Sequence, residues 1–177
     1  KTSMNEIAKV IRKEQYLHEI LAHYIKKTPV KTLSTSLPDE KDYQTHYAEE
    51  KLDQLPHDTY VAIASDNEDF SVSKNGLAFA YFTVSDITWV HRNDTKTGTT
   101  DFHVLHRKTG EPLKGVKAQV WLSKYNYNKG RYVKSNGGVY YSDNEGYFKV
   151  PYSQRNENQS FYVEFTQGND NIYTLSP

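Results

Sequence analysis

Residues 116–122 read V-K-A-Q-V-W-L, so small or branched apolar side chains alternate with polar or aromatic ones. Because successive side chains of a strand point to opposite faces, this alternation predicts a strand with one face on a core. The side chains expected to face inward are Val116, Ala118, Val120 and Leu122, with Trp121 opposite. Residues 161–166 repeat the pattern, with Phe161, Val163 and Phe165 inward and Tyr162, Glu164 and Thr166 outward.

The surrounding second half of the chain consists of short strand-like runs, most of them separated by Gly, Asn or Pro. The predicted strands cover residues 87–91, 101–107, 116–124, 131–134, 139–142, 147–150, 161–166 and 171–175. Strands of this length and spacing are typical of a Greek-key or Ig-like β-sandwich. We therefore expect residues 86–177 to form one complete sandwich, with a domain boundary at Ser85-Asp86.

The first half begins with a predicted helix over residues 3–27. Ser3 and Glu6 have the spacing of a capping box, an apolar stripe follows, and Pro29 lies just beyond the end. After it we predict strands at residues 31–37 (closed by Pro38-Asp39), 43–52, 59–65 and 77–84, the last of them inside a sheet. A helix and about four strands are fewer elements than a complete sandwich has. Residues 1–85 are thus predicted to be a partial module, and the whole chain is predicted to be mainly β with one N-terminal α-helix.

The composition limits the chemistry. Cys is absent, which excludes a Cys nucleophile, a thiolate metal site and a thioester within these residues. Lys plus Arg and Asp plus Glu are both 22, so no global field favours a nucleic-acid partner. The chain begins at Lys1 and shows no signal peptide and no apolar run of about 18 residues. We interpret it as an internal piece of a longer exported protein whose signal has been removed.

No residue is predicted to be catalytic, to bind a cofactor or to bind a metal. His103 and His106 lie three apart on a predicted strand and so point to opposite faces, which prevents them from holding one ion. The acidic run Asp143-Asn144-Glu145 lacks the alternate oxygens of a calcium loop and is predicted to be a β-turn. The common nucleophile, phosphate-loop, dinucleotide and zinc motifs do not occur, so we expect no enzyme and no small-molecule substrate.

The 15 Tyr residues are the unusual feature of the composition. Several lie with a Trp in or near one long predicted hairpin, and they form our candidate binding surface: Trp121, Tyr125, Tyr127, Tyr132, Tyr140 and Tyr141. Such rings can stack on sugars or anchor a protein partner. They can equally cover the outer face of a sheet, because Tyr suits a surface that is packed on one side and wet on the other.

Two turns in the second half carry a resemblance to a known family. Residues 109–116 read T-G-E-P-L-K-G-V and residues 142–148 read S-D-N-E-G-Y-F. In this order they resemble the Ig-like macroglobulin modules of bacterial alpha-2-macroglobulin-like proteins, and also carboxypeptidase regulatory-like and transthyretin-like β-domains. Residues 55–61, L-P-H-D-T-Y-V, resemble a strand entry of macroglobulin modules, with Asp58 where Gly is usual. Residues 79–87, F-A-Y-F-T-V-S-D-I, resemble the passage from one module to the next, and the preceding helix resembles members of the Bacteroidetes type.

The resemblance implies two consecutive macroglobulin-like modules, 1–85 partial and 86–177 complete, in the rigid frame of a protease-trapping inhibitor. It implies export to the periplasm or the outer-membrane surface of a bacterium, with the other domains of the parent protein and a trapped protease as partners. The family's thioester and bait segment lie in other domains, so no functional residue is carried over. The alternative is a carbohydrate- or protein-binding accessory β-sandwich (carboxypeptidase regulatory-like) of a surface polysaccharide-processing system. An incomplete first module could also expose a strand edge and form a dimer of the isolated chain.

Overall fold

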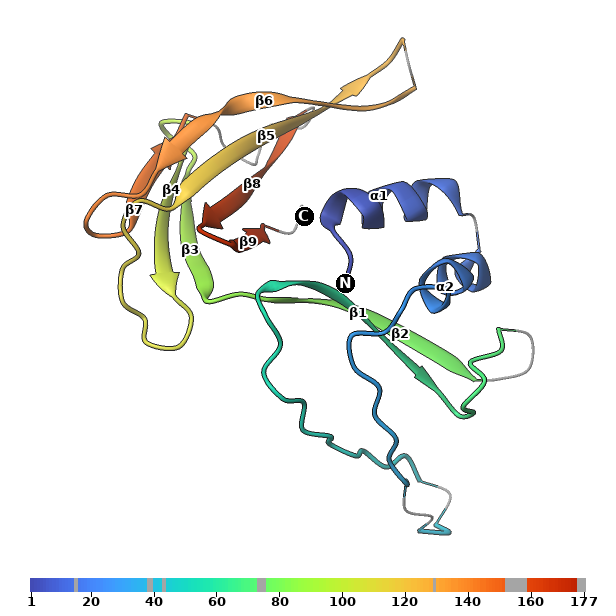
Figure 1. Cartoon of the computed structure of the whole chain (residues 1–177). Helices are drawn as coiled ribbons and strands as arrows, with labels where there is room; N and C mark the ends of the chain where they lie inside the picture. The colour runs from blue at the N-terminus through green and yellow to red at the C-terminus, as the bar shows by residue number, and fades with distance from the viewer. Residues whose placement is uncertain are drawn as a thin grey trace. The chain divides into compact units, whose positions relative to one another are not determined.

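The computed structural model describes residues 1–14, 16–37, 40–42, 44–72, 76–128, 130–151 and 159–174. The described chain is mainly β, as predicted, and its strands pair antiparallel (Figure 1). It divides into two compact units, Lys1–Val84 and Ser85–Pro177. No helix among the described residues is long and apolar enough to cross a membrane.

The first unit contains two helices where the sequence predicts one, α1 (Met4–Lys13) and α2 (Leu17–Ile25). Ser3 caps α1 as predicted, with its Oγ accepting from the Glu6 amide at 3.2 Å. The prediction of one continuous helix is wrong because Glu14 takes an extended conformation (φ −94°, ψ 122°). A second start signal follows, since the Tyr16 amide donates to the carboxylate of Glu19 at 3.1 Å.

The sheet of the first unit has two described strands, β1 (Asp58–Ser65) and β2 (Leu77–Val84), which pair antiparallel. The predicted strands at 31–37 and 43–52 are wrong within the described residues, where both segments are irregular and exposed. Apolar side chains are few in both segments, and Leu37 and Tyr47 remain 69% and 93% exposed. Strand β2 was predicted inside a sheet, but β1 is its one neighbour among the described strands. Pro38, Asp39 and Tyr43 lie outside the described residues.

The second unit is a sandwich of two antiparallel sheets. The first sheet has the order β3-β4-β7 and the second the order β6-β5-β8-β9. Their strands are β3 (Ile87–Asp94), β4 (Thr99–His106), β5 (Lys117–Asn126), β6 (Arg131–Tyr141), β7 (Tyr147–Val150), β8 (Gln159–Gln167) and β9 (Asp170–Tyr173). Leu175, the predicted end of the last strand, lies outside the described residues.

The core between these sheets contains the residues that the alternation predicts. Val116, Ala118, Val120, Val163 and Phe165 are completely buried, and Phe161 nearly so. Leu122 packs against this cluster from its edge. Phe102 and Phe148 enter from the opposite sheet, and their rings stack with centroids 5.0 Å apart. The predicted inward faces of both strands are therefore confirmed.

Strand β6 replaces two predicted strands, 131–134 and 139–142. The Gly137-Gly138 pair between them indicates a loop in the sequence, but in the structure it lies within the strand. A Cβ on Gly137 would lie 2.9 Å from Val120 Cγ1, so the missing side chain lets β6 approach β5 closely. The register of β5 and β6 shifts at Val120/Trp121, and Gly138 has a φ of +110°. The strand therefore continues past the two glycines by means of a β-bulge.

The two turns that carry the family resemblance meet in the structure. Ser142 Oγ accepts from the Val116 amide at 2.9 Å and donates to the Leu113 carbonyl at 2.6 Å. The Gly115 amide donates to the Ser142 carbonyl at 2.9 Å. One serine therefore fastens residues 109–116 to residues 142–148 at one end of the sandwich.

Candidate functional site

The outer face of the four-stranded sheet carries most of the predicted Tyr and Trp surface. Val120 and Leu122 face the core, so Trp121 and Tyr125 on β5 point away from it. The register adds to the same face Tyr132 of β6 opposite Tyr125, and Tyr162 of β8 opposite Trp121. Tyr173 of β9 lies opposite Glu164 of β8. We call this surface the aromatic face, and we define it by Trp121, Tyr125, Tyr132, Tyr162 and Tyr173.

Glu164 lies at the centre of the aromatic face and accepts three hydrogen bonds. Trp121 Nε1 donates at 3.0 Å, Tyr173 Oη at 2.7 Å and Asn171 Nδ2 at 3.1 Å. Burial acts to raise the pKa of Glu164, but the bonds from Tyr173, Trp121 and Asn171 outweigh it and lower the pKa below its ordinary value. The carboxylate therefore stays charged and fixes the rings around it.

Burial and the neighbouring Glu164 carboxylate raise the pKa of Tyr173 above its ordinary range. The phenol therefore remains a hydrogen-bond donor at any physiological pH. This arrangement is a rigid polar anchor, and it holds Trp121 by its nitrogen.

Lys134 covers part of the aromatic face. Its Nζ lies 3.8 Å from the centre of the Trp121 ring and 5.0 Å from the centre of the Tyr162 ring. A cation at this distance is attracted by the ring quadrupole, by about 0.5–1 kcal/mol at an exposed site. The face of Trp121 is thus occupied by a side chain of the same sheet and is not a bare stacking platform.

The most exposed rings of the predicted Tyr and Trp surface lie at the end of the β5–β6 hairpin, in residues 125–128 and 130–132, which we call the hairpin tip. Tyr125 contacts Tyr127 and Tyr132 edge-on, with ring centroids 5.1 and 5.2 Å apart. Tyr127 is 78% exposed and Tyr132 is 67% exposed. Strand β8 pairs with β5 only as far as Lys124, so the hairpin extends past the described end of the sheet (Figure 1).

The remaining two predicted residues lie apart from the tip. Tyr140 is opposite Ala118 and packs against the core, with its ring stacked 6.1 Å from that of Phe148, so it does not belong to the outer face. Tyr141 is exposed on the outer face, opposite Lys117 at the other end of β6. Sequence reasoning did not include Tyr173 and Lys134, and it named Tyr162 and Glu164 only as outward-facing. Their place beside Trp121 comes from the strand register.

The histidines and the acidic turn that are candidate metal ligands by residue type occupy ordinary strand and turn positions. His103 and His106 pair with Val90 and Ile87, on opposite faces of β4 as predicted. Asp143 Oδ1 accepts from the Glu145 and Tyr147 amides, both at 2.9 Å, and so closes the predicted turn. No group of three or more His, Asp or Glu side chains among the described residues is arranged to hold a metal ion.

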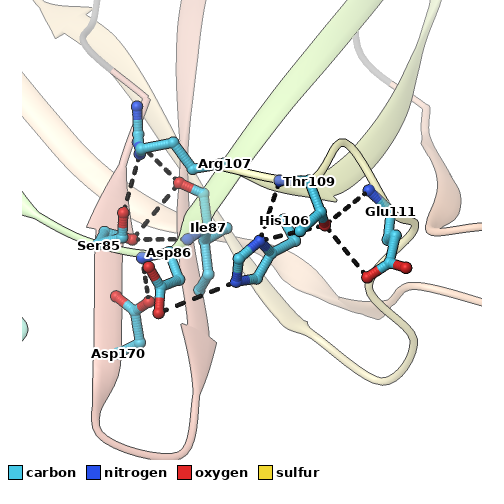
Figure 2. A network of polar contacts seen from close by, with 8 residues as sticks. All are labelled: Ser85, Asp86, Ile87, His106, Arg107, Thr109, Glu111 and Asp170. Carbon is cyan, nitrogen blue, oxygen red and sulfur yellow. Dashed lines mark hydrogen bonds and ion pairs between the residues drawn. The ribbon is translucent and has the colours of Figure 1, made fainter.

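A second polar cluster surrounds the residues at which the chain enters the sandwich (Figure 2). Arg107 donates from Nε to the Ser85 carbonyl at 2.8 Å and from Nη2 to the Ile87 carbonyl at 2.7 Å. The Asp86 amide donates to Asp170 Oδ2 at 2.8 Å. The guanidinium of Arg107, just after β4, and the carboxylate of Asp170 on β9 therefore hold residues 85–87 in place.

The same cluster continues into the turn after β4. His106 Nε2 lies 4.0 Å from Asp86 Oδ2, and its Nδ1 faces the amide and hydroxyl of Thr109 at 3.3 Å. Thr109 Oγ1 also donates to Glu111 at 3.1 Å. These contacts tie the T-G-E-P turn to the entry of the chain, and they position the backbone rather than a reacting atom.

Comparison with known proteins gives a structural similarity but no match in sequence. No family model matches the chain, and no curated protein matches it. A solved structure of native alpha-2-macroglobulin from Escherichia coli, spanning domains NIE–MG1, is similar over 54% of this chain, with 17% identity and a TM-score of 0.37. The matched part covers 39% of that structure's chain.

The aromatic face is suited to binding, and the entry cluster holds the backbone of residues 85–87 in place. The aromatic face combines rings with hydrogen bonds that are already made, and the entry cluster satisfies backbone groups. In the entry cluster the Thr109 hydroxyl lies 3.3 Å from His106 Nδ1, and the same hydroxyl donates to Glu111 at 3.1 Å.

Proposed function

We propose that the chain is part of the non-catalytic frame of an alpha-2-macroglobulin-like, protease-trapping inhibitor of the Bacteroidetes type. Its two units would be consecutive macroglobulin-like modules, the first partial and the second complete. The parent protein would be exported to the cell envelope, in the periplasm or at the outer surface. Its endopeptidase inhibitor activity would belong to the whole assembly and not to residues of this chain.

The observation that carries this proposal is the contact between the two turns of the resemblance. Ser142 joins residues 109–116 to residues 142–148 through both its hydroxyl and its backbone. The two turns that resemble the family therefore form one structural unit. If the resemblance of each turn were a coincidence, there would be no reason for the two turns to contact each other. The short passage from β2, ending at Val84, to β3, starting at Ile87, agrees with a direct succession of modules.

The test uses the full parent protein. It is incubated with trypsin, and cleavage of a small chromogenic peptide and of casein is followed in parallel. Entrapment predicts that peptide cleavage is retained while casein cleavage falls, and that the trypsin co-elutes with the parent on size-exclusion chromatography. A parent protein of only a few hundred residues would contradict the proposal, as would equal loss of both activities.

The hairpin tip favours a second candidate, a binding module of a surface polysaccharide-processing system. Tyr127 and Tyr132 remain exposed although the sandwich core is complete without them. Glycan-array binding that is lost in Tyr132→Ala would support this candidate. Failure to bind any glycan would remove it and leave the first proposal untouched.

A further inference from the structure

The β5–β6 hairpin is a long stretch of the chain without any acidic residue. Between Glu111 and Asp143 the sequence contains no Asp or Glu. It contains these basic residues: Lys114, Lys117, Lys124, Lys129, Arg131 and Lys134. The whole chain has equal numbers of acidic and basic residues, so the positive charge is concentrated here and is not a general property of the surface.

The register places these cations beside the exposed rings. Arg131 is opposite Asn126, next to the Tyr125–Tyr132 pair, and Lys124 precedes Tyr125 on β5. Because side chains alternate along a strand, Lys124 and Arg131 lie on one face of the hairpin and Tyr125 and Tyr132 on the other. Lys124, Arg131 and Tyr132 are all exposed. A ligand at the tip therefore meets rings on one side of a narrow ribbon and positive charge on the other.

The narrow shape of the tip decides between classes of partner. A stable interface with a folded protein needs about 800 Å² on each side, and a hairpin end of seven described residues is small for that. A flexible polymer can instead follow both faces of a ribbon. Its carboxylates would pair with Arg131, whose planar guanidinium can donate two hydrogen bonds to one carboxylate, while its apolar faces pack on the rings.

We infer that the hairpin tip binds an acidic polysaccharide, a chain of sugars that bear carboxylate groups. The inference deepens the second candidate function and rests on it. A sugar chain presents apolar C–H faces that would pack on Tyr127 and Tyr132, and hydroxyls that would bond to the side-chain amide of Asn128. Its carboxylates would pair with Lys124 and Arg131. Single-stranded nucleic acid is the other polymer that combines charge with stacking. The chain has a pI of about 7.2, in contrast to the strongly basic surface that nucleic-acid-binding domains present.

The test is affinity electrophoresis of the whole chain in gels that contain polygalacturonate, neutral dextran or single-stranded poly(dT), at low and at physiological salt. We expect retardation by polygalacturonate that weakens with salt, and none by dextran. Tyr127→Ala/Tyr132→Ala should reduce the affinity at least tenfold. Lys124→Ala/Arg131→Ala should reduce it similarly and flatten its salt dependence.

Matched controls are Tyr141→Ala, an exposed tyrosine of the same strand, and Lys108→Ala, an exposed lysine of the turn after β4. Both variants should bind polygalacturonate with the affinity of the unsubstituted chain, and circular dichroism should show that all variants are folded. Retardation by poly(dT) with none by polygalacturonate overturns the inference, as does polygalacturonate binding that survives both double variants. Tyr132-dependent binding to a neutral glycan alone also overturns it, while leaving the second candidate function standing.

Discussion

A Cβ atom placed on Gly146 would lie 2.3 Å from the carbonyl oxygen of Val104. Gly146 has a φ of +72°, and its own carbonyl accepts from the Val104 amide at 2.8 Å. The turn after β6 is therefore pressed against β4 at a point where only glycine fits. This contact explains in physical terms why the second of the two family-like turns carries Gly at that position.

Gly146→Ala is expected to destabilise the second unit by more than about 3 kcal/mol, because it combines backbone strain with a clash against a fixed carbonyl. Gly110→Ala is the matched control. Gly110 has a similar φ of +74° but nothing within 4 Å of its Cβ position, so it should lose about 1 kcal/mol from strain alone. Urea unfolding followed by Trp fluorescence measures both, since both Trp residues lie in this unit. Equal losses for the two variants would show that the contact with Val104 does not matter.

Arg107→Lys is expected to loosen the entry of the chain into the sandwich. A lysine keeps the charge but offers one nitrogen where Arg107 uses Nε and Nη2 for the Ser85 and Ile87 carbonyls, so at least one of these bonds should weaken and about 1–2 kcal/mol of stability should be lost. Hydrogen exchange of the Asp86 and Ile87 amides should accelerate with it. The control is Arg92→Lys, since Arg92 is exposed and makes one long contact of 3.4 Å with Asp101. Exchange that is unchanged at residues 86 and 87 would contradict the role given to Arg107.

The environment of Trp121 should change with pH, because the protonation of Glu164 changes the group that the indole N–H contacts. The pKa of Glu164 is lower in the folded chain than its ordinary value of 4.5, so its contribution to stability is complete above about pH 4.5 and declines as the pH falls further. The indole N–H signal of Trp121 in a ¹⁵N–¹H spectrum should move with that protonation and should already be displaced in Glu164→Gln. The signal of Trp89 serves as an internal control. A Trp121 signal that is indifferent to both changes would exclude the bond to Glu164.

The alternation of side chains was enough to predict the inward faces of β5 and β8, because burial follows strand periodicity directly. It could not predict that β6 is one strand. Gly137 and Gly138 indicate a loop unless it is known that Val120 and Leu122 lie against Gly137. The same register shift sends Tyr140 to the core and leaves Tyr141 outside, so neighbouring tyrosines that look equivalent in the sequence have different roles.

The candidate site shows the same limit. Trp121 and the tip tyrosines could be named from the sequence because they lie close together in one hairpin. Glu164 and Tyr173, more than forty residues after Trp121, join them only through the pairing of β5 with β8 and of β8 with β9. The position of Lys134 over Trp121 depends on the pairing of β5 with β6 and on the conformation of a long side chain, neither of which local sequence specifies.

Glu6 is expected to make the helices of the first unit sensitive to acid. The ammonium of Lys27 and the ring of His23, whose Nε2 is 3.0 Å away, lie against its carboxylate, and Thr2 Oγ1 donates to it at 3.2 Å. The contacts with Lys27 and His23 lower the pKa of Glu6 to about 2, against an ordinary value of 4.5. The carboxylate thus joins α1 to residues in and just after α2, and its protonation should release them.

The sign of the effect follows from the lowered pKa. Glu6 contributes its full stabilisation above about pH 4.5, and this contribution is lost as the pH falls from there towards 2. Glu6→Gln should therefore lower the thermal midpoint of the ellipticity at 222 nm, which reports on the described helices of the first unit. The difference in thermal midpoint between this variant and the unsubstituted chain should be largest above pH 5 and should disappear near pH 2. Glu49→Gln, at an exposed position in an irregular segment, should show no such difference at any pH. A penalty for Glu6→Gln that is the same at pH 6 and pH 2 would mean that packing, and not charge, connects Glu6 to α2.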